Sequence, residues 1–324
     1  MHYSGTRQSA AHTDYERGAL SFLKGATAMN TQLFLQFNTI FISILIEALP
    51  FILLAVVISA LIQLWVTDEM LAKLIPKNRF LSVLTATSLG AVFPACECGI
   101  IPVTQRLMAK GVPLHAAVAF MLTGPVINPV VLFSTYVAFG NSWKMVVLRG
   151  GLSFAVALLV GLILSYQFKG TSQLKHTLQS RKMPENSTAK NKVLGTIKHM
   201  IDEFFSVGKY LVAGAMIAAF MQTYLKTSVL TSIGNGDVSA SLVMMALAFI
   251  LSLCSSADAF VAASFRSTFS TGALIAFLVF GAKFDIKNTM MMLGVFKTKF
   301  VFYLFIYTAA FVFIGSVIIT VLQL

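Results

Sequence analysis

The chain is dominated by long apolar segments that carry no charged residue. An α-helix rises about 1.5 Å per residue, so roughly 20 apolar residues span the hydrocarbon layer of a membrane. Many of the uncharged segments approach or exceed that length, which indicates a membrane protein. They cover residues 25–46, 48–67, 80–96, 111–143, 150–168, 210–225, 238–257, 267–282 and 300–324.

These segments predict an all-α polytopic membrane protein with eight transmembrane helices. Residues 32–40 and 196–204 are expected to form interfacial helices that lead into the first and fifth crossings. The predicted crossings are 40–65, 80–106, 112–140, 146–167, 203–226, 239–265, 272–296 and 299–323.

A polar, basic stretch separates two apolar blocks of similar size. Residues of the two blocks match at nearly constant spacing: Cys96 and Cys254 lie 158 positions apart, and Asn128 and Asp285 lie 157 apart. Internal repeats are typical of transporter folds. We therefore predict two four-helix repeats whose helices are broken near the membrane midplane. The predicted divisions are a polar N-terminal extension (1–31), a first transmembrane repeat (32–168), a cytoplasmic basic linker (169–200) and a second transmembrane repeat (201–324).

Composition narrows the class of protein. Only 11% of the residues are charged and 57% are hydrophobic, whereas soluble proteins average roughly 25% charged residues. This excludes soluble enzymes and nucleic-acid-binding proteins. The three cysteines lie inside apolar segments, so a disulfide scaffold is excluded as well. The first 30 residues lack the charged, apolar and small-residue regions that follow one another in a removable signal peptide.

The net charge of +12 comes mainly from lysine and arginine in short loops, where it acts as a topology signal. With residues at the segment ends included, 13 basic residues fall on the side of the N-terminus, Arg106, the linker and Arg266, where Arg106 and Arg266 are expected as topology anchors. The other side holds 8, among them Lys144 and two borderline residues at segment ends, Arg149 and Lys299. The positive-inside rule then places both termini in the cytoplasm. Four crossings per half would make the repeats parallel, an inference that re-entrant segments would overturn.

The second predicted crossing contains the most informative cluster. Pro94 and Pro102 favour an unwound stretch around Cys96, Glu97 and Cys98. Irregular backbone at membrane depth is tolerated where it is buried in protein or lines a cavity. Thiolates suit zinc, copper(I) or a trivalent arsenical, and the carboxylate suits proton exchange or an extra ligand. The alternative is that both cysteines are small apolar fillers and that the carboxylate is held by a neighbouring donor.

A second break is predicted in the third crossing, at Gly124 to Pro129. Glycine fits just past the end of one half-helix, and Asn128 followed by proline suits the N-cap and first position of the next. The new half-helix would point its positive end at the membrane centre. This arrangement suits a binding site for an anion or a polar substrate. The alternative is a simple proline kink.

The second half repeats this chemistry in altered form. Cys254 and Asp258 fall in the sixth crossing, and Lys283, Asp285 and Lys287 fall in the seventh, where the aspartate takes the predicted capping role of Asn128. Ionisable residues within a membrane span are functional candidates because an unpaired charge there is unfavourable. A local structural ion pair is the alternative for the two lysines and Asp285.

Seven residues are therefore our candidates for substrate binding, and two of them, Glu97 and Asp258, are candidates for proton coupling. No phosphate-binding loop, metalloprotease or hydrolase motif is present, so we expect neither an enzyme nor a cofactor, and no metal site is assigned. The substrate-binding candidates are Cys96, Glu97, Cys98, Asn128, Cys254, Asp258 and Asp285.

Three stretches, Pro-Ala-Cys-Glu-Cys-Gly-Ile-Ile-Pro, Thr-Gly-Pro-Val-Ile-Asn-Pro and Cys-Ser-Ser-Ala-Asp-Ala, resemble a bacterial permease family that includes the ArsP organoarsenical efflux permeases. The resemblance covers residues from about 35 to 322. It implies an eight-helix permease of the cytoplasmic membrane, and its arsenical members imply export of trivalent organoarsenicals without ATP hydrolysis. It also implies that a second membrane protein is a possible partner. The positions that carry the match are Cys96, Cys98, Asn128, Cys254 and Asp258.

We therefore expect a secondary transporter, an exporter of a small thiophilic solute, with its site between the two halves. Its partners would be the lipid bilayer and a small-molecule or ionic substrate, with no nucleic acid. Two rival hypotheses stay open. One is a channel or permease for a hard ion or polar metabolite, and the other is a membrane thiol oxidoreductase that uses Cys96 and Cys98.

Overall fold

The structure is a computed structural model, and it describes residues 5–65, 70, 75–76, 78–93, 96–168, 173–174, 189–224 and 236–323. Within these ranges the regular secondary structure is helical, apart from one isolated bridge between Leu174 and Phe296. The helices are α1 (Gly5–Trp65), α3 (Arg79–Val92), α4 (Glu97–Ala109), α5 (Leu114–Ile127), α6 (Pro129–Ala138), α7 (Trp143–Gln167), α8 (Ala189–Tyr224), α10 (Asp237–Leu251), α11 (Ala257–Ser264), α12 (Thr271–Gly281), α13 (Ile286–Val295) and α14 (Thr298–Val321).

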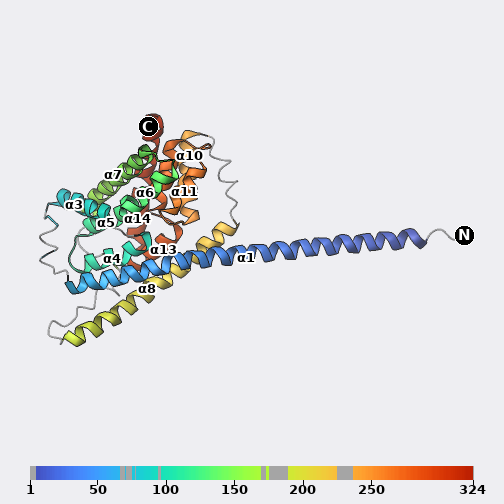
Figure 1. The fold of residues 1–324 in the computed structure, drawn as a ribbon, viewed down its shortest axis with the longest axis horizontal. Helices are drawn as coiled ribbons and strands as arrows, with labels where there is room; N and C mark the ends of the chain where they lie inside the picture. Colours follow the sequence, from blue (N-terminus) through green and yellow to red (C-terminus); the bar gives the residue numbers. More distant parts are fainter. Residues whose placement is uncertain are drawn as a thin grey trace.

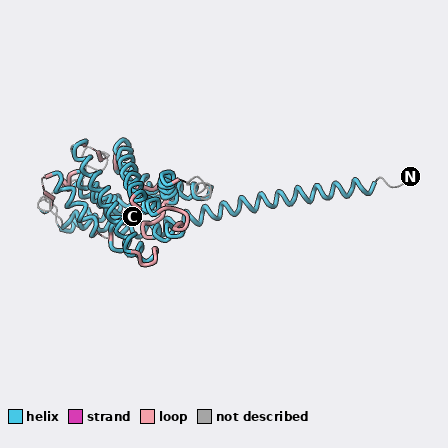
Figure 2. Tube along the Cα trace, turned by 90° about the horizontal axis from the view of Figure 1, so that it is seen from above, coloured by secondary structure: helices cyan, strands magenta, loops and turns pink. Residues whose placement is uncertain are grey.

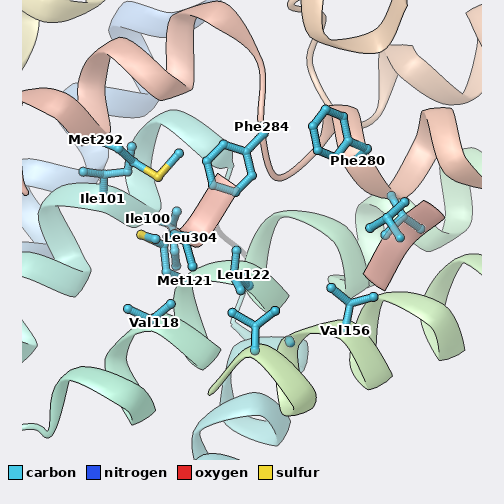
Figure 3. Packing of buried hydrophobic residues seen from close by; sticks show 14 of the residues in the cluster. Ile100, Ile101, Val118, Met121, Leu122, Val156, Phe280, Phe284, Met292 and Leu304 are labelled. Atoms are coloured by element: carbon cyan, nitrogen blue, oxygen red, sulfur yellow. The ribbon is translucent and has the colours of Figure 1, made fainter. Parts of the chain in front are cut away.

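Two short helices that are apolar all round form the centre of the molecule. Every residue of α12 after the first is buried, and so is almost every residue of α5. A helix that is hydrophobic on all sides has to be enclosed by other helices. Accordingly, α7 packs against α5 and α14 packs against α12. Figure 3 shows part of this core, in which Leu122, Val156, Phe280 and Phe284 are among the packed side chains.

The surrounding helices present apolar side chains outward and small polar ones inward. On α14, Phe302 and Ile314 are exposed, whereas Thr308 and Ser316 are buried. This pattern is that of a helix in lipid, where close packing and interhelical polar contacts hold helices together. Among the described residues, five stretches are helical, long and apolar enough to cross a membrane: Thr31–Ile62, Leu114–Ala138, Trp143–Gln167, Met200–Tyr224 and Thr298–Val321. The chain is therefore a multi-pass membrane protein.

Each of the four segments in which a break was predicted is interrupted in the structure. The segment 80–106 is divided into α3 and α4, and 112–140 into α5 and α6. The segment 239–265 is divided into α10 and α11, and 272–296 into α12 and α13. The predicted interruption of these helices is thus confirmed.

Helix directions in the first half differ from those predicted. A Cβ on Gly90 would lie 2.8 Å from the carbonyl oxygen of Phe120, and a Cβ on Gly161 would lie 2.8 Å from Val83 and 3.1 Å from Ala119. The N-terminal part of α3 thus lies beside the N-terminal part of α5, and the C-terminal part of α3 lies beside residues further along α5. The two helices therefore run in the same direction. Only four residues connect α4 to the start of α5. The α3–α4 pair therefore returns to the end of the molecule at which it began.

The second half has the same arrangement. A Cβ on Gly281 would lie 3.0 Å from the Cβ of Ala248, so the last turns of α10 and α12 meet and the two packed helices run in the same direction. A short loop connects α11 to the start of α12. A Cβ on Gly272 would overlap the hydroxyl of Thr320, so α12 starts beside the end of α14. The α10–α11 pair also returns to the end at which it began.

The molecule therefore has two distinct ends. We call the end that holds the last residues of α4 and α7 the linker end, because the linker starts there. The backbone N–H of Lys297, just after α13, donates to the carbonyl of Gln173 at 2.9 Å, which places the end of α13 there as well. We call the other end, where α7 and α12 start and α14 finishes, the terminal end.

These directions correct three expectations. The segments 80–106 and 239–265 are not single full crossings, because each reverses direction at its break. The C-terminal residues of α14 lie at the opposite end from the linker, so the linker and both termini do not share one side. Lys144 and Arg266, predicted on opposite sides, line one cavity at the terminal end. Hydrophobic pattern alone does not record the direction of a helix, which explains the error.

The first helices of the two halves, α1 and α8, pack against each other in opposite directions. The hydroxyl of Ser59 on α1 reaches Glu203 on α8, and Ile44 lies in a small apolar cluster with Ala215 and Ala218. Figure 1 shows the two helices side by side, and Figure 2 shows the N-terminal part of α1 extending beyond the bundle. Both helices are continuous, so 32–40 and 196–204 are not separate interfacial helices.

Candidate functional site

Four half-helices begin at the interruptions, and three of them are capped by side chains there. The Cys96 thiol accepts from the N–H of Gly99 at 3.3 Å at the start of α4. The Asn128 side-chain oxygen accepts from the N–H of Val131 at 2.9 Å at the start of α6. Asp285 accepts from the following helix in the same way at the start of α13. The predicted capping roles of Asn128 and Asp285 are thus observed.

A cavity of about 110 Å³ lies where three of these helix starts converge. The N-cap residues of α4, α6 and α11, namely Cys96, Asn128 and Ser256, all border it. Backbone N–H groups at helix starts and the helix dipoles favour electron-rich or anionic groups in such a place. The full lining is Phe51, Cys96, Glu97, Pro125, Asn128, Val130, Val131, Cys254, Ser255 and Ser256.

A smaller hollow continues from this cavity toward α1, and the two share Phe51, Cys96, Glu97 and Cys254. All three cysteines of the chain border the hollow, together with Glu97 and Lys287. The structure thus brings the predicted thiols from both halves to one place. We call the cavity and the hollow together the thiol cavity. All three thiols are free.

Glu97 links the two halves beside the thiol cavity. Its Oε2 accepts from the hydroxyl of Ser255 at 2.8 Å, and its Oε1 lies 3.3 Å from the ammonium of Lys287. The same ammonium lies 3.7 Å from Asp285. A buried charge is retained when it is paired and hydrogen-bonded. Glu97 therefore joins the start of α4 to the segment just before α11 and to α13.

Sequence reasoning missed Arg149, which was taken as a residue at a segment end. Its side chain is completely buried on α7. It donates to the hydroxyl of Thr135 at 2.7 Å and to the carbonyl of Ser255 at 2.9 Å. Ser255 thus accepts from Arg149 and donates to Glu97. Arg149 positions the wall of the thiol cavity without lining it, and an arginine at the edge of an apolar segment is the only sequence signal that marks it.

Two candidate residues do not border the thiol cavity. Asp258 is buried in the first turn of α11, and its Oδ2 has no hydrogen-bond partner among the described residues. Asp285 serves as a cap and as a neighbour of Lys287. Lys283 donates to the carbonyl of Leu122 at 2.7 Å, so it joins α5 to the second half. The structure gathers Cys96, Glu97, Cys98, Asn128 and Cys254, and it places the other two candidates behind them.

Among the described residues, no group of three or more histidine, cysteine, aspartate or glutamate side chains is placed to hold a metal ion. The three thiols therefore border one cavity without forming a pre-built metal cage.

A second polar cluster missed by sequence reasoning lies nearer the linker end. Arg106, expected only as a topology anchor, donates to Glu203 at 2.9 Å. Ser59 donates to both oxygens of the same carboxylate, at 3.1 and 3.2 Å, and accepts from the Arg106 Nε at 3.3 Å. This three-residue lock joins α4, α1 and α8.

The predicted permease family ArsP_1 matches residues 33–321. The UPF0718 protein YcgR of Bacillus subtilis is 62% identical over 286 residues, which cover 88% of this chain and 97% of that protein. A protein of Streptococcus mutans, named as a two-component membrane permease complex subunit, is 44% identical over 82% of this chain and 89% of its own length. No solved structure matches this chain. With a match over nearly its whole apolar region, the chain belongs to this predicted permease family.

Proposed function

We propose that this chain is a secondary transporter that exports a small thiophilic solute through the thiol cavity. The single observation that carries the proposal is that Cys96, Cys98 and Cys254, from both halves, border one hollow at interrupted helices. Interrupted helices at the boundary between repeats form the substrate sites of many secondary transporters. Membership of a permease family supports transport rather than enzymatic chemistry.

The substrate class follows from the side chains. Two thiols can bond a trivalent organoarsenical, which offers exchangeable positions on a soft atom. When two thiols bond to methylarsenite, two As–O bonds break and its two hydroxyl groups leave as water with the thiol protons. Glu97 lies between Cys96 and Cys98 in the chain and can relay these protons to the leaving hydroxyl groups. Proton exchange at Glu97 or Asp258 is the proposed coupling step, and Asn128 would orient polar groups of the substrate. Asp285 would act on the site through Lys287.

Helix directions support an inverted-repeat architecture in place of the two parallel four-crossing repeats predicted from sequence. Each half would contain three crossings and one re-entrant pair. The crossings of the first half are α1, α5–α6 and α7, with α3–α4 re-entering from the linker end. Those of the second half are α8, α12–α13 and α14, with α10–α11 re-entering from the terminal end. Three crossings per half make the second half upside down relative to the first.

This architecture changes the proposed orientation. When each connecting segment is assigned to the helix ends that it joins, 14 lysine and arginine residues belong to the linker end and 6 to the terminal end. The positive-inside rule then favours a cytoplasmic linker, as before, and external N- and C-termini, which reverses the expectation from sequence. The membrane would be the bacterial cytoplasmic membrane.

Helix packing also supports alternating access. α1 packs on α4 and α8 packs on α13, both on the linker side of the thiol cavity. The equivalent pairs on the terminal side, α1 with α6 and α8 with α11, make no comparable contact among the described residues. Val130, which borders the cavity on α6, is 62% exposed. These contacts support a proposed state that is closed toward the linker end, with the Arg106–Glu203–Ser59 lock on the closed side.

Transport by everted membrane vesicles tests the proposal. Wild-type vesicles should accumulate methylarsenite when a proton gradient is imposed, and Cys96→Ser and Cys98→Ser should each abolish accumulation while the protein stays in the membrane. Ala157→Ser, a buried change on α7 away from the cavity, is the control and should transport normally. Full transport by the double Cys96→Ser, Cys98→Ser variant would eliminate a thiophilic substrate.

A permease for a small anion or polar metabolite is the second candidate, favoured by the three helix starts at the cavity. In that case the thiols would be bystanders. A panel of organic anions and metals in the same vesicles distinguishes the two, because an anion permease should transport equally with and without the cysteines.

We also propose that a second membrane protein associates with the chain, since a relative is named as a subunit of a two-component membrane permease complex. Affinity purification of the tagged chain from its native membrane should recover an integral membrane protein in constant ratio. Recovery of the tagged chain alone under mild detergent conditions would argue against a stable partner.

A further inference from the structure

A second cavity, of about 230 Å³, lies at the terminal end and shares no residue with the thiol cavity. We propose that it binds the phosphate group of an anionic ligand at the depth of the lipid headgroups. This inference does not rest on the proposed transport of thiophilic solutes. The cavity is lined by Phe139, Ser142, Lys144, Met145, Arg266, Phe269, Thr271 and Leu274.

The polar part of the lining comes from both halves of the chain. Lys144 and Ser142 lie at the start of α7, whereas Arg266 and Thr271 flank the loop between α11 and α12. None of the described lining residues is acidic. Two cations and two hydroxyl groups around one hollow match the charge and the acceptor oxygens of a phosphate group.

Helix ends add to this positive field. α7 begins at Trp143, and its N-cap Ser142 makes no side-chain capping hydrogen bond. α12 begins at Thr271, so a second helix start borders the same cavity; there the Ser270 hydroxyl already accepts from the N–H of Ala273, and the start contributes through its dipole. The first N–H groups of a helix have no partner within the helix, and its dipole favours an anion there. The two basic side chains and the two helix starts therefore all make the electrostatic potential in the cavity more positive.

The depth of the cavity is indicated by aromatic residues. Trp143 is 67% exposed, and its ring lies 4.9 Å from that of Tyr136. Exposed tryptophan and tyrosine concentrate at the level of the lipid headgroups. The apolar part of the wall consists of buried Phe139, Met145, Phe269 and Leu274. A cationic opening over an apolar wall suits the phosphate and the adjoining glycerol of a lipid, although a free phosphate offers the same oxygens.

Fluorescence of Trp143 provides the test. The chain contains two tryptophans, so Trp65→Phe leaves Trp143 as the reporter. This variant is placed in phosphatidylcholine vesicles that contain increasing amounts of brominated phosphatidylglycerol or brominated phosphatidylcholine, and quenching is measured. A parallel titration uses inorganic phosphate with the detergent-solubilised protein. The site variant is Lys144→Gln with Arg266→Gln, and the matched control is Lys297→Gln with Lys299→Gln, which removes two exposed charges at the linker end.

The proposal expects brominated phosphatidylglycerol to quench Trp143 at a much lower mole fraction than brominated phosphatidylcholine. The site variant should need roughly tenfold or more of the anionic lipid, whereas the control variant should behave like the parent. Exchange of the two charges, Lys144→Arg with Arg266→Lys, should preserve binding. A response to inorganic phosphate that the site variant loses would identify a free phosphate as a ligand of the same site. Equal quenching by both lipids without any phosphate response, or equal loss in site and control variants, would overturn the proposal.

Discussion

At the scale of single residues, the centre of the molecule depends on one buried ion pair. Glu97 and Lys287 come from different halves and both are almost completely buried. The sequence identified both residues as candidates, because charged residues in apolar segments stand out. It did not indicate which residues they pair with, because two residues 190 positions apart share no local pattern that would predict an ion pair.

Lys287→Met tests the importance of this pair. The change leaves the Glu97 carboxylate buried without its cation, which typically costs about 3–5 kcal/mol. We expect a marked fall in the thermal unfolding temperature in detergent. The double variant Glu97→Gln, Lys287→Met removes the pair but leaves Asp285 without its neighbouring cation, so it should recover part of that loss. If the double variant were as unstable as the single one, the lysine would act through packing rather than through charge.

Arg149 shows where residue-level prediction failed. An arginine at the boundary of a predicted span normally anchors the helix at the membrane surface. Here the side chain lies inside the bundle because Thr135 and the carbonyl of Ser255 accept its donors. Both acceptors are ordinary in type and distant along the chain, so no local pattern distinguishes this arginine from an anchor.

At the scale of helices, the interruptions were predictable because their causes are local. Proline removes a backbone donor, and asparagine or aspartate before a helix supplies an acceptor for its first N–H groups. Asn128 and Asp285 do this in corresponding positions of the two halves. Helix direction was not predictable. An apolar segment with a central break has the same hydrophobic pattern whether the chain continues across the membrane after the break or turns back.

Alanine at either cap tests this element of the structure. Asn128→Ala and Asp285→Ala should each lower stability by about 1 kcal/mol or more, because no water replaces the lost acceptor. Asn128→Asp and Asp285→Asn keep an acceptor oxygen and should fold with smaller losses. Thermal unfolding of the four purified variants provides the comparison. Equal losses for the alanine and the acceptor-retaining variants would show that capping does not contribute.

At the scale of the whole molecule, the inverted arrangement predicts that the linker and the C-terminus lie on opposite sides of the membrane. A protease site inserted into 176–186 should be cut in everted vesicles and protected in intact spheroplasts. Alkaline phosphatase fused after the last residue should be active, and a fluorescent protein fused there should stay dark. A fluorescent C-terminal fusion combined with a linker that is cut in everted vesicles would restore the sequence-based orientation and exclude three crossings per half.

The lock formed by Arg106, Glu203 and Ser59 carries the last prediction, which concerns the balance between the two access states. Glu203→Gln weakens a charge-assisted interaction on the closed side, and a loss of about 1.5–3 kcal/mol would shift the equilibrium roughly ten- to hundredfold toward opening at the linker end. Thiols in the cavity should then react faster with a membrane-impermeant reagent in everted vesicles and more slowly in spheroplasts. Lys198→Gln, an exposed change on the same helix, is the control and should leave both rates unchanged. Faster reaction from both sides would indicate general loosening, and unchanged rates would show that the lock does not control access. A faster reaction on one side together with a slower reaction on the other is expected only when the protein alternates between two states, each closed at one end. In such an equilibrium, opening one end requires closing the other.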